Sequence, residues 1–122
     1  MSIVLWVLQI VLAVLFLAVG GLKLAKPKEA LLPQMGALAP YRPLTIKAIG
    51  ASEVLAALGL VVAPLVGWDA LVPWAALGVT AVMLFGAIAH GEAGEWKKIG
   101  LNAVVLVLAL VVVYGRSADL PL

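Results

Sequence analysis

Four side chains of this sequence could take part in chemistry inside an apolar environment: Lys23, Glu53, His90 and Asn102. Glu53 is one of only six carboxylates, and it lies within a long apolar stretch of the chain. An ionisable group at such depth is costly and is seldom kept without a partner or a task. Burial favours the neutral acid, whereas a nearby Lys23 favours the carboxylate. A carboxyl between such opposing effects suits proton transfer, so Glu53 and His90 are the candidate acid/base groups.

The composition is that of an integral membrane protein. The chain is 66% hydrophobic and 11% charged, and its mean hydropathy is +1.23. We expect one domain, residues 1–122, because four spans of about 20 residues would use most of the chain. The formal net charge is only +2, and the basic residues flank apolar stretches, which indicates a lipid bilayer as partner and excludes nucleic acid. The lack of cysteine excludes a disulfide, a thiol redox couple and a thiolate metal site.

Hydropathy predicts four membrane-spanning helices, at about residues 3–24, 44–66, 70–89 and 97–114. The segment between the first two contains prolines spaced too closely for a spanning helix: Pro27, Pro33, Pro40 and Pro43. We expect this segment to be interfacial and to cover one mouth of the bundle with its apolar residues, Leu31, Leu32, Met35 and Leu38. The predicted fold class is therefore all-α, an antiparallel four-transmembrane-helix bundle with a proline-rich interfacial segment between its first two helices.

Small residues predict where the helices pack, because helices in lipid associate through close backbone approach. Gly20 and Gly21 would let the second span approach the first. On the second span, Ala48, Ser52 and Ala56 form a ridge of small residues at four-residue spacing. These positions predict a compact bundle.

The four candidate residues fall in one half of the predicted bundle. Lys23 and His90 lie at the ends of the first and third spans, Asn102 lies about one turn into the fourth, and Glu53 is deepest, at roughly 10 to 14 Å. They predict a polar pocket in which Lys23 tunes Glu53 while His90 and Asn102 orient a polar head. Structural alternatives stay open: Lys23 can snorkel or simply pair with Glu53, His90 can be a loop residue, and Asn102 can bond between helices.

The distribution of basic residues predicts the orientation. Seven of the eight flank the first and third loops, and Arg116 alone lies on the other side; the seven are Lys23, Lys26, Lys28, Arg42, Lys47, Lys97 and Lys98. By the positive-inside rule those two loops are cytoplasmic. We expect a multi-pass protein of the cell membrane with both termini outside.

Several short motifs resemble those of one family. Residues 20–24 (Gly-Gly-Leu-Lys-Leu) resemble the ending of the first helix in DoxX-like membrane proteins, and residues 49–54, which contain Glu53, resemble the family's Gly-x-x-Glu motif. Residues 89–92, 102–105 and 114–116 are similar to its later helices. The resemblance covers nearly the whole chain and implies a four-helix membrane fold. The family is named after a small subunit of a thiosulfate:quinone oxidoreductase, so the resemblance also implies a borrowed quinone.

Three functions remain open. The first is a pocket for a small lipid-soluble molecule, quinone-like or isoprenoid-like, bound by Lys23, Glu53, His90 and Asn102. The second is an accessory subunit that anchors a soluble oxidoreductase through the basic loops. The third is a transporter or permeability factor, which the lack of a polar track across the bilayer disfavours. The sequence contains no haem-type histidine pair, flavin motif or metal-ligand cluster, so we expect no intrinsic cofactor, and a homo-oligomer is compatible with all three.

Overall fold

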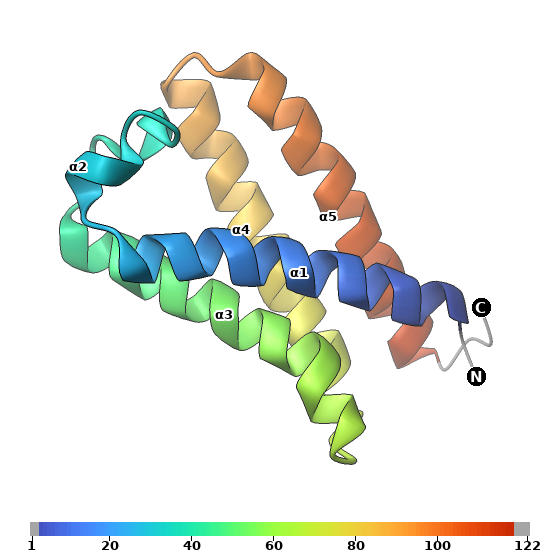
Figure 1. Ribbon diagram of the computed structural model, residues 1–122. Helices are drawn as coiled ribbons and strands as arrows, with labels where there is room; N and C mark the ends of the chain where they lie inside the picture. The colour runs from blue at the N-terminus through green and yellow to red at the C-terminus, as the bar shows by residue number, and fades with distance from the viewer. Residues whose placement is uncertain (1–2, 119–122) are drawn as a thin grey trace.

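The computed structural model describes residues 3–118 and is helical throughout its regular structure (Figure 1). Four helices are long and apolar enough to cross a membrane: α1 (Ile3–Ala25), α3 (Pro43–Leu65), α4 (Leu71–Glu92) and α5 (Trp96–Ser117). A short helix α2 (Lys28–Leu31) and a 3-10 turn η1 (Gly36–Leu38) lie between α1 and α3. The predicted fold class is confirmed, and the protein is a multi-pass membrane protein.

Local chemistry explains where the long helices begin and end. α1 stops two residues before Pro27, and α3 begins with Pro43 in its first turn, where a missing N–H is tolerated. Gly67 and Gly94 follow the ends of α3 and α4 with φ of 88° and 75°, a left-handed conformation that glycine adopts without steric cost. The turns after α3 and α4 are therefore tight, and neighbouring helices run antiparallel.

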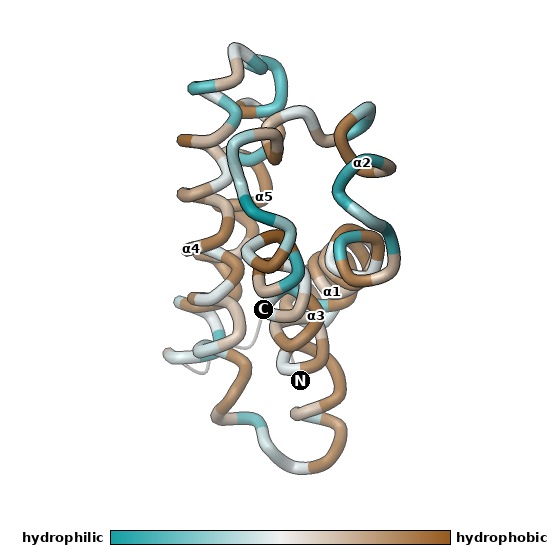
Figure 2. The backbone as a smooth tube through the Cα atoms, turned by 90° about the vertical axis from the view of Figure 1, so that its left-hand side faces the viewer, coloured by the Kyte–Doolittle hydropathy of each residue, from teal (hydrophilic) through white to brown (hydrophobic). Residues whose placement is uncertain are grey.

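The long helices form two pairs, α1 with α3 and α4 with α5, and the pairs diverge toward one end (Figure 1). We call this the lysine-rich end; it carries the segment 26–42 and the turn between α4 and α5. The opposite, terminal end carries the start of α1, the end of α5 and the turn between α3 and α4. Figure 2 shows hydrophilic residues gathered in the loops and mainly hydrophobic residues along the long helices.

The apolar core lies in the terminal half. A Cβ added at Gly59 would lie 2.8 Å from Cβ of Ala75, and one added at Gly115 would lie 2.7 Å from Cδ2 of Leu5, so the pairs meet closely there. Within residues 3–118, the buried positions of α4 and α5 all fall in this half or near the middle: Val72, Ala76, Val79, Val105, Ala109, Val112 and Gly115. In the lysine-rich half, α4 and α5 expose several large apolar side chains, which suits a lipid environment: Leu84, Phe85, Ile88, Leu101 and Val104.

A polar network at the terminal end begins with a proline inside α3. Pro64 has no N–H, so the carbonyl of Leu60 lacks its usual helical donor. The fully buried Gln9 supplies one, since its Nε2 donates to that carbonyl at 2.6 Å. Nε of Arg116 in turn donates to Oε1 of Gln9 at 2.6 Å, and its guanidinium lies 5.6 Å from the Trp6 ring centre. The network joins α1, α3 and α5.

The segment 26–42 packs against the bundle, as predicted. Leu31 and Leu38 are buried with Ile46 of α3, and Leu32, Met35 and Tyr41 pack against them. Lysines tie the segment down: Lys28 donates to the carbonyls of Ala39 and Tyr41, and Lys98 of α5 donates to the carbonyl of Gln34. The segment thus connects the two diverging helix pairs.

Candidate functional site

Two glycines bring α1 and α3 into backbone contact. A Cβ added at Gly20 would lie 2.8 Å from the carbonyl oxygen of Gly50, and a Cβ added at Gly50 would lie 2.9 Å from that of Gly20. Contacts this short leave no room for a side chain on either helix. The prediction for Gly20 is confirmed, whereas nothing lies within 4 Å of a Cβ at Gly21.

Of the predicted ridge on the second span, only Ala56 is buried. Ala48 and Ser52 are exposed, and the Ser52 hydroxyl donates to the carbonyl of Ile49 in its own helix. The face that α3 buries contains Gly50, Glu53 and Ala57 as well as Ala56. Four-residue spacing of small residues occurs on more than one face of α3, and spacing alone does not select the face.

Lys23 and Glu53 form a buried ion pair one turn from this glycine contact. The distance between Nζ of Lys23 and Oε1 of Glu53 is 2.6 Å. Helical side chains lean toward the N-terminus of their own helix. Because α1 and α3 are antiparallel, Lys23 leans into the bundle while Glu53 leans toward the lysine-rich end, so the two side chains approach each other.

The pair lies well inside the apolar part of the protein. Glu53 is ten residues after Pro43, about 15 Å along α3, and its side chain is only 2% exposed. The Lys23 side chain is 12% exposed and starts two residues before α1 ends. A lysine this close to a helix end could snorkel to the headgroups, but its ammonium is turned inward to the carboxylate.

His90 belongs to a separate polar cluster at the turn between α4 and α5. Its Nδ1 lies 3.0 Å from Oε1 of Glu95, whose Oε2 accepts from Nζ of Lys98 at 2.8 Å. The Lys98 hydrogen bond, followed by that of His90, holds the pKa of the Glu95 carboxyl below its ordinary value. Glu95 was not predicted from the sequence as a site residue. Its position between His90 and Lys98, next to the turn glycine, is the pattern that could have indicated it.

Asn102 joins α4 to α5. Its Nδ2 donates to the carbonyl of Met83 at 3.3 Å, and it lies 2.8 Å from the position of a Cβ at Gly86. Gly86 therefore makes room for the amide. This contact is the interhelical hydrogen bond that was one of the alternatives for Asn102.

The structure thus brings together two of the four predicted site residues. Within residues 3–118, no hydrogen bond or ion pair joins His90 or Asn102 to Lys23 or Glu53. A family model described as the DoxX-like family matches residues 7–112, which include most of all four long helices and every predicted site residue. The chain belongs to the DoxX-like family. No curated protein and no solved structure matches this DoxX-like protein significantly.

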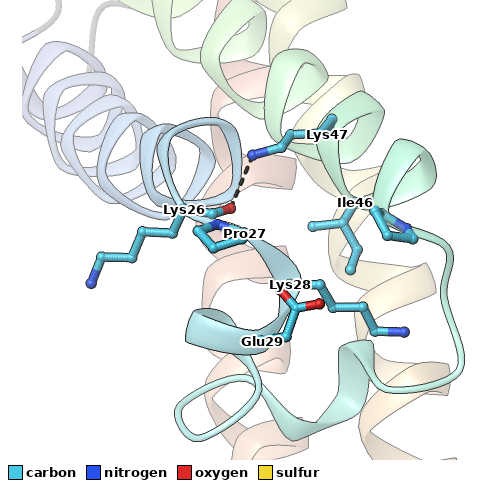
Figure 3. Close-up of a pocket in the computed structure, with 7 residues that line it drawn as sticks. Lys26, Pro27, Lys28, Glu29, Ile46 and Lys47 are labelled. Atoms are coloured by element: carbon cyan, nitrogen blue, oxygen red, sulfur yellow. Dashed lines mark hydrogen bonds between the residues drawn. The ribbon is translucent and has the colours of Figure 1, made fainter.

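The DoxX-like protein has a cavity of about 340 Å³ at the lysine-rich end, between the end of α1, α2 and the start of α3 (Figure 3). It is lined by Lys26, Pro27, Lys28, Glu29, Pro43, Ile46 and Lys47. The basic groups do not converge: Lys47 donates to the carbonyls of Leu24 and Lys26, and Figure 3 shows the side chains of Lys26 and Lys28 pointing to opposite sides. None of the predicted site residues lines this cavity.

A second cavity, of about 310 Å³, lies between η1 and the end of α4. Tyr41, Ala89 and Glu92 are among its lining residues, and it too contains none of the four predicted residues. In the described part of the DoxX-like protein, no three His, Asp or Glu side chains are grouped so that they could hold a metal ion. The Lys23–Glu53 pair is therefore the candidate functional site.

Proposed function

We propose that this DoxX-like membrane protein binds a small lipid-soluble molecule by its polar head at the Lys23–Glu53 pair, with Glu53 as the group that exchanges a proton. The buried pair itself, 2.6 Å between Nζ and Oε1 and about 15 Å along α3, supports the proposal. Desolvating two charges is costly, and apolar residues of similar volume often serve as well structurally. Buried ionisable groups in membrane helices generally mark functional sites.

The shape of the bundle favours access from the bilayer. The two helix pairs diverge toward the lysine-rich end, and no residue of α4 after Val79 or of α5 before Val105 is fully buried among residues 3–118. An apolar tail could lie along these helices while its head reaches Lys23, the more exposed member of the pair. Asn102 and His90, on the other helix pair, are proposed to orient the head.

The other two functions have weaker support. An accessory subunit would dock through its basic residues, but Lys28, Lys47 and Lys98 already donate to carbonyls or to Glu95 within the chain. A transporter would need a polar path. Gln9 and Glu53 are the buried polar side chains among residues 3–118, and an apolar core lies between them.

The test compares Glu53→Gln, Lys23→Met and the double variant with the unmodified protein. Small molecules that co-purify in mild detergent are identified by mass spectrometry, and thermal stability is measured on the same samples. Glu92→Gln is the matched control, because Glu92 is an exposed carboxylate at the end of α4. We expect Glu53→Gln to remain folded and to lose the co-purified molecule, while Glu92→Gln keeps it.

The double variant separates a structural role from a functional one. If the pair only locks α1 to α3, removing both charges together is tolerated and nothing else is lost. If the proposal holds, the double variant is at least as stable as either single variant but retains no ligand. Full retention of the molecule by a folded Glu53→Gln protein would exclude Glu53 as the proton-exchanging group.

A further inference from the structure

The hydrogen-bonding capacity of the buried pair is only partly used. The Lys23 ammonium has three N–H donors, and one of them goes to Oε1 of Glu53. Oε2 of Glu53 accepts no hydrogen bond within residues 3–118, although only 2% of the Glu53 side chain is exposed. A buried acceptor without a donor is destabilising, so this oxygen is open for a partner outside the chain.

The charge of the pair limits what that partner can be. A lysine ammonium and a glutamate carboxylate 2.6 Å apart compensate each other, and no other ionised side chain contacts them in the described residues. A phosphate, carboxylate or ammonium head group would add an uncompensated charge at a depth where charge is costly. The head group that fits is neutral.

The unused hydrogen-bonding groups of Lys23 and Glu53 differ in kind. Lys23 offers donors only, and Oε2 of the ionised Glu53 is an acceptor only. A hydroxyl satisfies both, because its O–H donates to Oε2 while its lone pair accepts from Nζ. A carbonyl can accept from Lys23, but it leaves Oε2 without a donor. The same buried atoms therefore discriminate between an alcohol or phenol and the corresponding carbonyl compound.

Resting on the proposed function, we infer that the ligand presents a neutral hydroxyl to Lys23 and Glu53, as a quinol or an isoprenoid alcohol does. The quinone or aldehyde counterpart then binds more weakly at the same place. The difference lies in how tightly two forms of a head group bind, and it requires no electron transfer by the protein.

The experiment measures the affinity of the full chain, in lipid nanodiscs, for two matched pairs of probes. Decylubiquinol is compared with decylubiquinone under anaerobic conditions, and farnesol is compared with farnesal. Within each pair the apolar part is shared and only the oxygen function changes. In whichever pair binds, we expect the hydroxyl form to bind several-fold to about tenfold more tightly, as one additional hydrogen bond predicts.

Glu53→Gln changes the discrimination rather than only the affinity. Its amide can turn an N–H toward the ligand, so the preference for the hydroxyl form falls or reverses, while Glu92→Gln keeps it. Equal affinity for both forms, or tighter binding of the carbonyl form to the unmodified protein, would overturn this inference and leave the proposed function standing. Binding of none of the four probes would overturn it as well, whereas the co-purified molecule decides the proposed function separately.

Discussion

Pro64 removes a backbone N–H donor from α3, and the side chain of Gln9 supplies a donor in its place. The energetic coupling between Gln9 and Pro64 can be measured. In the unmodified protein, Gln9→Leu removes the donor to the Leu60 carbonyl and the acceptor for Nε of Arg116. Pro64→Ala restores a backbone N–H four residues after Leu60, so the helix can satisfy that carbonyl itself. Gln9→Leu should therefore cost less in the Pro64→Ala background than in the unmodified protein.

The expected coupling is that of one hydrogen bond within a membrane protein, about 0.6 kcal/mol and at most about 1.7 kcal/mol. Gln9→Leu alone breaks one buried and one partly buried hydrogen bond, so we expect a total cost of about 1 to 3 kcal/mol. The Arg116 contribution remains in both backgrounds and cancels in the double-mutant cycle. The coupling thus isolates the bond from Nε2 to the Leu60 carbonyl.

The assay is reversible unfolding in mixed micelles, followed by helical circular dichroism for the four members of the cycle. Thr80→Val combined with Pro64→Ala is the control cycle, because the Thr80 hydroxyl donates to Ala76 within its own helix. We expect the control changes to be additive. Additive costs for Gln9→Leu and Pro64→Ala would refute the claim that Gln9 serves the carbonyl that the proline frees.

Three further predictions concern helix packing, acid stability and orientation in the membrane. Gly50→Val should separate α1 from α3 and cost about 1 to 3 kcal/mol in thermal or chemical unfolding, whereas Gly21→Ala, with nothing within 4 Å, should be tolerated. The lowered pKa of Glu95 adds stability that is complete above the ordinary carboxyl pKa and is lost as the pH falls through the lowered value. Glu95→Gln should therefore remove this acid dependence from the melting temperature. An unchanged pH profile of the melting temperature would contradict the assignment. Single cysteines placed after residue 116 should react with an impermeant reagent from outside intact cells, as the orientation predicted from the basic residues requires, and labelling only after the cytoplasmic face is opened would reverse that orientation.

The four spans could be predicted from the sequence because length and apolarity are local properties. Each long helix of the structure matches one predicted span to within about three residues at either end, and Pro43 stands in the first turn of α3, where the second span was expected to begin. The third span was expected to end near residue 89, but α4 continues to Glu92, and Gly94 follows it in a left-handed conformation. A glycine permits a turn after a helix, but its position alone does not fix the last helical residue.

The candidate site could be predicted only in part, because pairing depends on how each helix is rotated. Lys23 and Glu53 were found as partners since two charges at this depth need one another. The predicted pocket required four helices to turn one polar group each to a common place. In the structure His90 contacts Glu95 at the α4–α5 turn, and Asn102 donates to the carbonyl of Met83 on α4. Gln9 was foreseeable in principle, since Pro64 implies a carbonyl without a donor.

The two buried polar side chains of the described residues differ in one respect that bears on function. Gln9 is satisfied at both ends: its Nε2 donates to the Leu60 carbonyl and its Oε1 accepts from Arg116. Glu53 has one oxygen on Lys23 and the other without a donor in residues 3–118. A group kept only for structure tends to have its hydrogen bonds completed by the fold, as Gln9 has. The incomplete set at Glu53, in the half where the helix pairs diverge, is therefore better explained by a partner that comes from the bilayer.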